Sequence, residues 1–203
     1  MNTYEQYWHE FVDRRDGKKA WDEYTPYELR MVGTFVRLGW RDRAHELLPF
    51  FLAGRRPAAW NQWAEVVGQD PRKVRFLGDM PHGWVASDFI RSLLDVFAYE
   101  READHALVLA AGVPREWLTA SGVAVKGLRT PYGRLSYTLK KQADRVTLRL
   151  AAGSRLPPGG FVFIWPEDQP PPPARVNGKP SAWQGNELHI AELPATVVVN
   201  ARR

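Results

Sequence analysis

The hydrophobic pattern of this 203-residue chain changes its period once, near Ser121. Before that point, apolar residues recur every three or four positions, which is typical of amphipathic helices. After it, they alternate with polar residues in short runs separated by turn-forming residues, which is typical of β-strands. We therefore expect an α+β protein in two parts, with a helical domain over residues 1–120 and an antiparallel β-sandwich over residues 121–203.

Five helical segments are expected in the first part. Residues 4–14 would place four aromatic side chains on one side of a helix. In the next helix, Thr25 is expected as the N-cap, Pro26 as the first helical residue and Glu28 as the partner in a capping box, with Gly39 at the end. A helix from Asp42 to Gly54 should pair with it as an αα-hairpin, because few residues separate the two. A shorter helix over 59–67 and a long, largely buried helix over 81–99 complete the set.

The second part contains six or seven short strands with turns between them. The turn-forming sequences include TPYG at 130–133 and the Asn177-Gly178 pair. The expected strands are GVAVKGL, RLSYTLKK, RVTLRLAA, GFVFIWP, NELHIAEL and ATVVVNA.

Composition narrows the possible functions. The chain has no cysteine, so it can form neither a disulfide nor a thiolate metal site. Its five histidines are dispersed along the sequence, and we expect no bound metal or cofactor. The formal net charge is +5, but the cations are scattered along the sequence, so no nucleic-acid partner is expected. Without an export signal or a membrane-spanning apolar run, we expect a soluble, cytoplasmic protein.

The stretch from Trp60 to Glu100 holds most of the residues suited to chemistry. Indoles, carboxylates and an imidazole are concentrated there, in what should be loops and the entry to the long helix. Loops of this composition often bind ligands. Tryptophan is common in cores and as a flat platform for sugar rings, so the nine tryptophans of the chain favour a carbohydrate ligand. The long helix is expected to carry Trp84, Asp88, Arg91 and Asp95 on one polar face.

The order of these parts resembles the C-terminal end of α-L-rhamnosidase-like enzymes in the six-hairpin glycosidase superfamily. The motifs that carry the resemblance are Trp60-x-x-Trp63, the sequence GDMPHGW from Gly78 to Trp84, and the phrase WLTASGVAVKGLRTPYGRLSYTLKK at the start of the second part. In that family an (α/α)6 toroid is followed by a closing β-sandwich. The resemblance implies an inverting glycoside hydrolase whose late tryptophan-containing loop supplies a carboxylate as general base.

On this resemblance, the catalytic pair is assigned to Glu65 and Asp79. Asn61 stands where the family has its carboxylate, so Glu65 is taken as the base. Trp60, Trp63, His82 and Trp84 are assigned to the substrate. Each residue also has a structural interpretation: Asp79 as a helix N-cap, Glu65 as a solvated helix residue, His82 as a loop fastener and the tryptophans as core. The alternative function is a non-catalytic sugar-binding or protein-interaction module derived from such an enzyme.

The length of the chain allows only part of a toroid. Twelve helices need on the order of 200 residues, whereas the helical part here has about 120. A partial toroid should end in an uncovered apolar edge, and exposed apolar patches commonly mark interfaces. We therefore expect a homodimer or a partner chain bound through the N-terminal helices, with Tyr4, Tyr7, Trp8 and Phe11 at the interface. The isolated chain should have little or no hydrolase activity.

Overall fold

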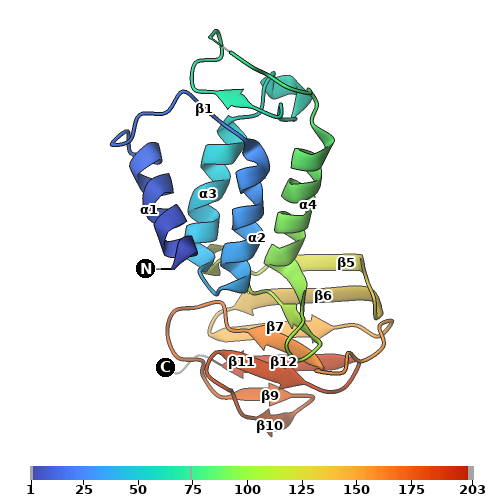
Figure 1. Ribbon diagram of the computed structural model, residues 1–203. Coiled ribbons are helices and arrows are strands. Elements are labelled where there is room, and N and C mark those ends of the chain that lie inside the picture. Colours follow the sequence, from blue (N-terminus) through green and yellow to red (C-terminus); the bar gives the residue numbers. More distant parts are fainter. Residues whose placement is uncertain (1, 74, 201–203) are drawn as a thin grey trace. The chain divides into compact units, whose positions relative to one another are not determined.

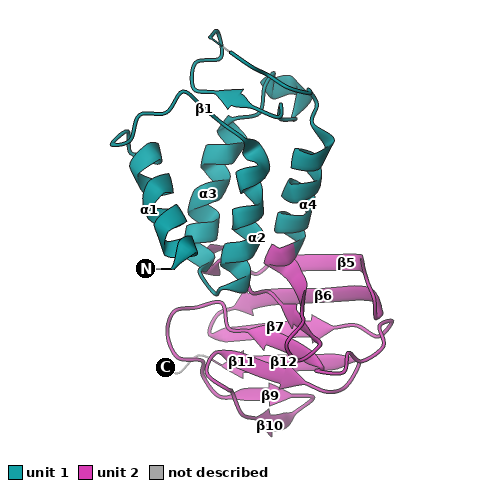
Figure 2. Ribbon diagram, viewed as in Figure 1, with its two compact units in different colours: residues 1–94 teal, residues 95–203 magenta. Residues whose placement is uncertain are grey.

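The computed structural model describes residues 2–73 and 75–200. The described residues form an α+β protein with four α-helices and twelve short or medium-length strands (Figure 1). The chain divides into two compact units, the first ending at Leu94 and the second beginning at Asp95 (Figure 2). Within the described ranges, each helix is too short or too polar to cross a lipid bilayer.

Helix α1 (Thr3–Arg15) confirms the first expected helix. The side chain of Asn2 caps it by accepting a hydrogen bond from the backbone N–H of Glu5 at 2.9 Å. Its aromatic side chains pack within unit 1, and Phe11 is buried against Phe50 with ring centroids 5.4 Å apart. Trp8 lies edge-on to Phe35 at 6.0 Å. Of the four aromatic residues that were expected at an interface, Tyr7, Trp8 and Phe11 therefore pack inside unit 1, and Tyr4 is exposed.

The second helical segment begins differently from the expected capping box. A 3-10 turn, η1 (Pro26–Leu29), precedes α2 (Arg30–Arg37), and the Thr25 side chain makes no capping hydrogen bond. The Glu28 carboxylate, the expected partner in the capping box, instead accepts hydrogen bonds from both terminal nitrogens of Arg14 and from the Tyr7 hydroxyl. Glu28 thus fastens α1 to η1. Helix α3 (Arg41–Ala53) follows and pairs with α2 as expected.

The prediction of a helix over residues 59–67 is wrong. Only a 3-10 turn, η2 (Ala58–Trp60), forms there, and it ends at Asn61, which has a left-handed backbone with φ of 55°. The indole N–H of Trp63 donates to the Phe51 carbonyl at 2.7 Å and draws the following chain into the core. Residues Val67–Gly68 then form β2, which pairs with β1 (Glu23–Tyr24).

Helix α4 (Gly83–Phe97) is the long helix expected over residues 81–99. Val85, Ser92 and Val96 are buried on one side of the helix, and the Ser92 hydroxyl donates to the Leu29 carbonyl at 2.9 Å. Ile90 and Leu94 are exposed, so the helix is less buried than expected. Asp95, which was expected on the polar face with the exposed Arg91, is buried.

Unit 2 starts before the expected boundary near residue 120. Strand β3 (Ala98–Arg101) continues directly from α4 and pairs with β4 (Ala106–Leu109). Both strands belong to unit 2 because they complete a four-stranded sheet in the order β11-β8-β4-β3. In this sheet β8 (Phe161–Ile164) pairs with β11 (Glu187–Ile190) antiparallel and with β4 parallel.

The second sheet of unit 2 has six strands in the order β10-β9-β12-β7-β6-β5, and all neighbours are antiparallel. Its strands are β5 (Val123–Thr130), β6 (Gly133–Gln142), β7 (Arg145–Leu150), β9 (Ala174–Val176), β10 (Lys179–Ser181) and β12 (Ala195–Asn200). Inward-facing residues of both sheets, such as Leu139 and Phe163, form a single hydrophobic cluster. The alternation predicted from sequence therefore serves one shared core.

Candidate functional site

The segment between Trp63 and His82 folds back on itself in unit 1. Three backbone hydrogen bonds hold the two arms together: Glu65 N–H to the Asp79 carbonyl at 3.0 Å, Val66 N–H to the Leu77 carbonyl at 3.2 Å, and His82 N–H to the Trp63 carbonyl at 2.9 Å. Residues that are far apart in the sequence of the loop are thereby brought opposite each other. The fold places the Glu65 side chain beside the turn at Gly78.

Gly78 is required for this close approach. Its φ is +64°, a conformation that residues with a Cβ rarely adopt. A Cβ built on Gly78 would lie 2.3 Å from Oε2 of Glu65 and 2.6 Å from its Cβ. The glycine thus positions the Glu65 carboxylate against the turn that carries Asp79.

The sequence-assigned residues Glu65, Asp79 and His82 meet in the folded loop. One ligand atom from each lies within 4.8 Å of the other two. The Asp79 side chain is 86% exposed, whereas His82 is buried, with its Nδ1 3.8 Å from Oδ2 of Asp79. The arrangement therefore holds an imidazole in place beneath a carboxylate that is open to solvent.

Tyr27, which sequence reasoning missed, completes the site from η1. Its hydroxyl lies 2.5 Å from Nε2 of His82, and the two rings meet edge-to-face with centroids 5.4 Å apart. Partial burial, together with the negative charges of Glu65 and Asp88, raises the pKa of the Tyr27 hydroxyl above its ordinary value. A protonated Tyr27 can donate to Nε2, and Nδ1 would then carry the imidazole proton that faces Asp79.

Trp84 lies beside Tyr27 and His82 and is the most accessible aromatic residue of the site. Its side chain is 73% exposed, and its ring centroid lies 5.9 Å from that of His82 and 6.4 Å from that of Tyr27. We call the five residues the Trp84 surface; they are Tyr27, Glu65, Asp79, His82 and Trp84. The surface combines an open indole with hydroxyl, imidazole and carboxylate groups.

An ion pair between α2 and α4 borders the Trp84 surface. Arg30 donates to Oδ2 of Asp88 at 2.8 Å, and its guanidinium lies 5.2 Å from the centroid of the Tyr27 ring. The ring of Tyr27 is therefore held between Arg30 and His82. Arg30 lies three residues after Tyr27, but its partner Asp88 is 58 positions further along the chain, so no local motif signals the whole arrangement.

Two tryptophans assigned to substrate from the sequence lie outside the Trp84 surface. Trp63 is 2% exposed, its N–H is bonded within the chain, and its ring packs on Phe89 at 5.0 Å, so it belongs to the core. Trp60 is 58% exposed on η2, and it makes no ring contact with a described aromatic residue. The N-cap interpretation of Asp79 is also wrong, because α4 begins four residues later, at Gly83.

The spacing of Glu65, Asp79 and His82 limits their chemistry. Inverting glycosidases hold their two carboxyl groups about 6.5–9.5 Å apart to admit water and substrate, whereas oxygen atoms of Glu65 and Asp79 approach within 4.8 Å. Tetrahedral zinc bound at about 2.1 Å brings its ligand atoms to about 3.4 Å from one another. The three side chains could hold a cation only after moving closer together. As they stand, they are placed to accept and donate hydrogen bonds.

Comparison with known proteins yields no relative. No protein-family profile, curated protein or solved structure matches the chain. Any role for the Trp84 surface depends on its own geometry.

Proposed function

We propose that this protein binds carbohydrate at the Trp84 surface. The observation that carries the proposal is the 73% exposed indole of Trp84, set beside the Tyr27 hydroxyl, the His82 imidazole and two carboxylates. An indole offers a rigid apolar face of the kind on which sugar rings stack. Carboxylate, imidazole and hydroxyl groups at its edge supply acceptors and donors for sugar hydroxyls.

Binding without hydrolysis is the form of the function that this geometry supports best. One oxygen of Glu65 lies within 4.8 Å of one oxygen of Asp79, which leaves little room between them for the water and sugar that inverting hydrolysis needs. A sugar hydroxyl can instead be shared between the two carboxylates, with Asp79 free to adjust because it is exposed. We expect no turnover of aryl α-L-rhamnosides by the isolated chain.

The resemblance to six-hairpin glycosidases supplies an origin for such a site. We propose that unit 1 corresponds to late hairpins of an (α/α)6 toroid and that the two sheets of unit 2 form the closing β-sandwich. The α2–α3 hairpin, the following tryptophan-containing loop and the shared core of the two sheets support this proposal. In this account the chain retains a sugar-binding surface of such an enzyme rather than its catalytic pair.

Isothermal titration of the full chain with L-rhamnose, aryl α-L-rhamnosides and neutral gluco-, manno- and galacto-oligosaccharides tests the proposal. We expect at least one sugar to bind, and Trp84→Ala to weaken that binding about 30-fold, the ~2 kcal/mol typical of an aromatic hot spot. Trp117→Ala is the matched control, since it removes another exposed indole from unit 2. Equal binding by the two variants, or no binding by any sugar at millimolar concentration, would refute the proposal.

A further inference from the structure

The six-stranded sheet of unit 2 has an unusual charge composition. Its six strands contain nine lysine and arginine residues and no aspartate or glutamate. Soluble domains normally intersperse both signs of charge over their surfaces. This sheet therefore carries a positive charge that its own strands do not neutralise.

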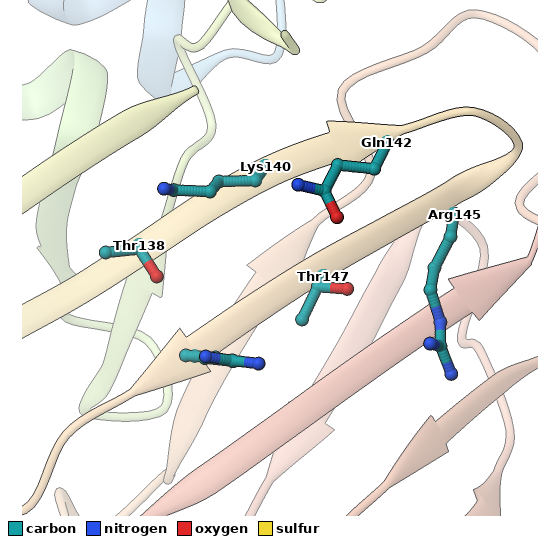
Figure 3. Close-up of a pocket in the computed structure, with 6 residues that line it drawn as sticks. Thr138, Lys140, Gln142, Arg145 and Thr147 are labelled. Atoms are coloured by element: carbon teal, nitrogen blue, oxygen red, sulfur yellow. The ribbon is translucent and has the colours of Figure 1, made fainter. Parts of the chain in front are cut away.

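Strand pairing gathers a large part of this charge on one face. Thr138 pairs with Arg149, Lys140 with Thr147, and Gln142 with Arg145, and paired residues point to the same side of a sheet. The alternating residues between them, such as Leu139 and Leu148, fill the core on the other side. We call this outward surface of β6 and β7 the basic face; Figure 3 shows its side chains on adjacent strands.

The basic face is accessible and its cations lack acidic partners. Lys140, Arg145 and Arg149 are exposed, and no carboxylate of the described residues lies within salt-bridge distance of them. These three cations and the side chains of Thr138, Gln142 and Thr147 line a depression of about 330 Å³. Neighbouring strands extend the charge, since Arg175 of β9 lies beside Val198 of β12, which is opposite Thr147.

We propose that the basic face binds the phosphate backbone of a nucleic acid duplex. Lysine and arginine interleaved with threonine and glutamine are the side chains that contact phosphate oxygens in protein–DNA complexes. The paired outward positions of β6 and β7 carry no aromatic side chain for base stacking, so recognition is through the backbone and is independent of sequence. Like charges left unpaired on one face repel one another, and a polyanion relieves that repulsion.

In the linear sequence the cations of the basic face are scattered, which is why no nucleic-acid partner was expected. Lys140 and Arg145 are separated in sequence by Lys141, Gln142, Ala143 and Asp144, and Arg145 and Arg149 by Val146, Thr147 and Leu148. Because only every second residue of a strand faces outward, the apolar residues between them are removed to the core. The sheet thus concentrates charge that the sequence disperses.

Fluorescence anisotropy with a labelled 20-base-pair duplex of random sequence tests the proposal on the full chain. The triple variant Lys140→Gln, Arg145→Gln, Arg149→Gln removes three cations from the basic face. The matched control Lys18→Gln, Arg72→Gln, Lys73→Gln removes three exposed cations from unit 1. Both variants have the same net charge, so a difference in their affinity for the duplex shows which surface binds it. Thermal melts confirm that both fold.

We expect the basic-face variant to bind the duplex on the order of 100-fold more weakly at 0.1 M salt. The slope of log K against log[salt] should become shallower by about 2.7, because each lost phosphate contact contributes about 0.9. The control should keep the wild-type slope. Equal losses in the two variants, or no duplex binding by the wild type at 50 mM salt, would overturn the proposal. Binding of a sulfated polysaccharide but not of the duplex would overturn it as well.

Discussion

The ion pair between Arg14 and Glu28 should be one of the strongest single contributions to the stability of unit 1. The two guanidinium nitrogens donate to the two carboxylate oxygens at 2.9 and 2.5 Å, and the Tyr7 hydroxyl adds a bond at 2.8 Å. Burial lowers the pKa of Arg14, but the hydrogen bonds and charge of Glu28 outweigh it and raise the pKa above its ordinary value. Burial raises the pKa of Tyr7, so Tyr7 remains a donor.

The magnitude follows from the exposure of the pair. Breaking a fully buried ion pair costs about 3–5 kcal/mol, whereas an exposed pair contributes about 0–1 kcal/mol. The side chains of Arg14 and Glu28 are 15% and 22% exposed, close to the buried limit. Arg14→Met or Glu28→Gln alone should therefore lower the free energy of unfolding by about 2–3 kcal/mol. The double variant should lose less than the sum, with a coupling of at least about 1.5 kcal/mol.

Urea unfolding followed by circular dichroism at 222 nm suits this measurement, because all four helices begin in unit 1. The control is Lys19→Gln with Glu10→Gln, which removes an exposed ion pair on the same helical unit. The control should leave the unfolding midpoint unchanged. A coupling near zero between Arg14 and Glu28 would show that the packing of Phe11 and Phe50, rather than this pair, fixes α1.

Three further outcomes are expected. Gly78→Ala should weaken sugar binding at the Trp84 surface at least tenfold, because the new Cβ displaces Glu65, whereas Gly83→Ala, which has open space, should not; titration with the bound sugar compares them. Hydrogen bonds from Arg101 lower the pKa of Asp104, so the stability that its ionised carboxylate adds to the folded state is fully present above about pH 4 and is lost as the pH falls through the lowered pKa. Melting temperatures from pH 6 to 2 should therefore decline less steeply for Asp104→Asn than for the wild type. EDTA should leave sugar binding unchanged, since the carboxylates and His82 act as hydrogen-bonding groups; loss of binding on chelation, restored by added zinc or calcium, would contradict this.

Periodicity predicted the elements whose signal is local. Helices α1, α2, α3 and α4 and the strands β5, β6, β7, β8, β11 and β12 lie where the hydrophobic repeats indicated. The errors arose where distant groups compete for a residue. Glu28 bonds Arg14 instead of forming a capping box, and Trp63 bonds Phe51 instead of continuing a helix. Strand β3 was hidden because it continues from α4 without a turn-forming residue.

The candidate site was likewise predicted only in part, because some of its contacts join residues that are distant in sequence. Glu65, Asp79 and His82 were selected from composition and resemblance, and the folded loop brings them together. Tyr27 could not be found, since it reaches His82 across 55 positions of sequence. Trp63 was misassigned because composition does not separate an exposed indole from a buried one. The grouping of Lys140, Arg145 and Arg149 depends on how β6 and β7 pair, and this register could not be inferred from their positions in the sequence.

The most direct test of sugar binding at the Trp84 surface is an NMR titration of the uniformly ¹⁵N-labelled chain. Its nine tryptophans give indole N–H signals that can be assigned by substitution, which makes each indole a separate reporter. Titration with a sugar that binds should shift the Trp84 indole signal and the backbone amides of Glu65, Asp79 and His82. The buried Trp63 indole should shift little. A saturating sugar that leaves the Trp84 signal unmoved and shifts residues elsewhere would contradict the account.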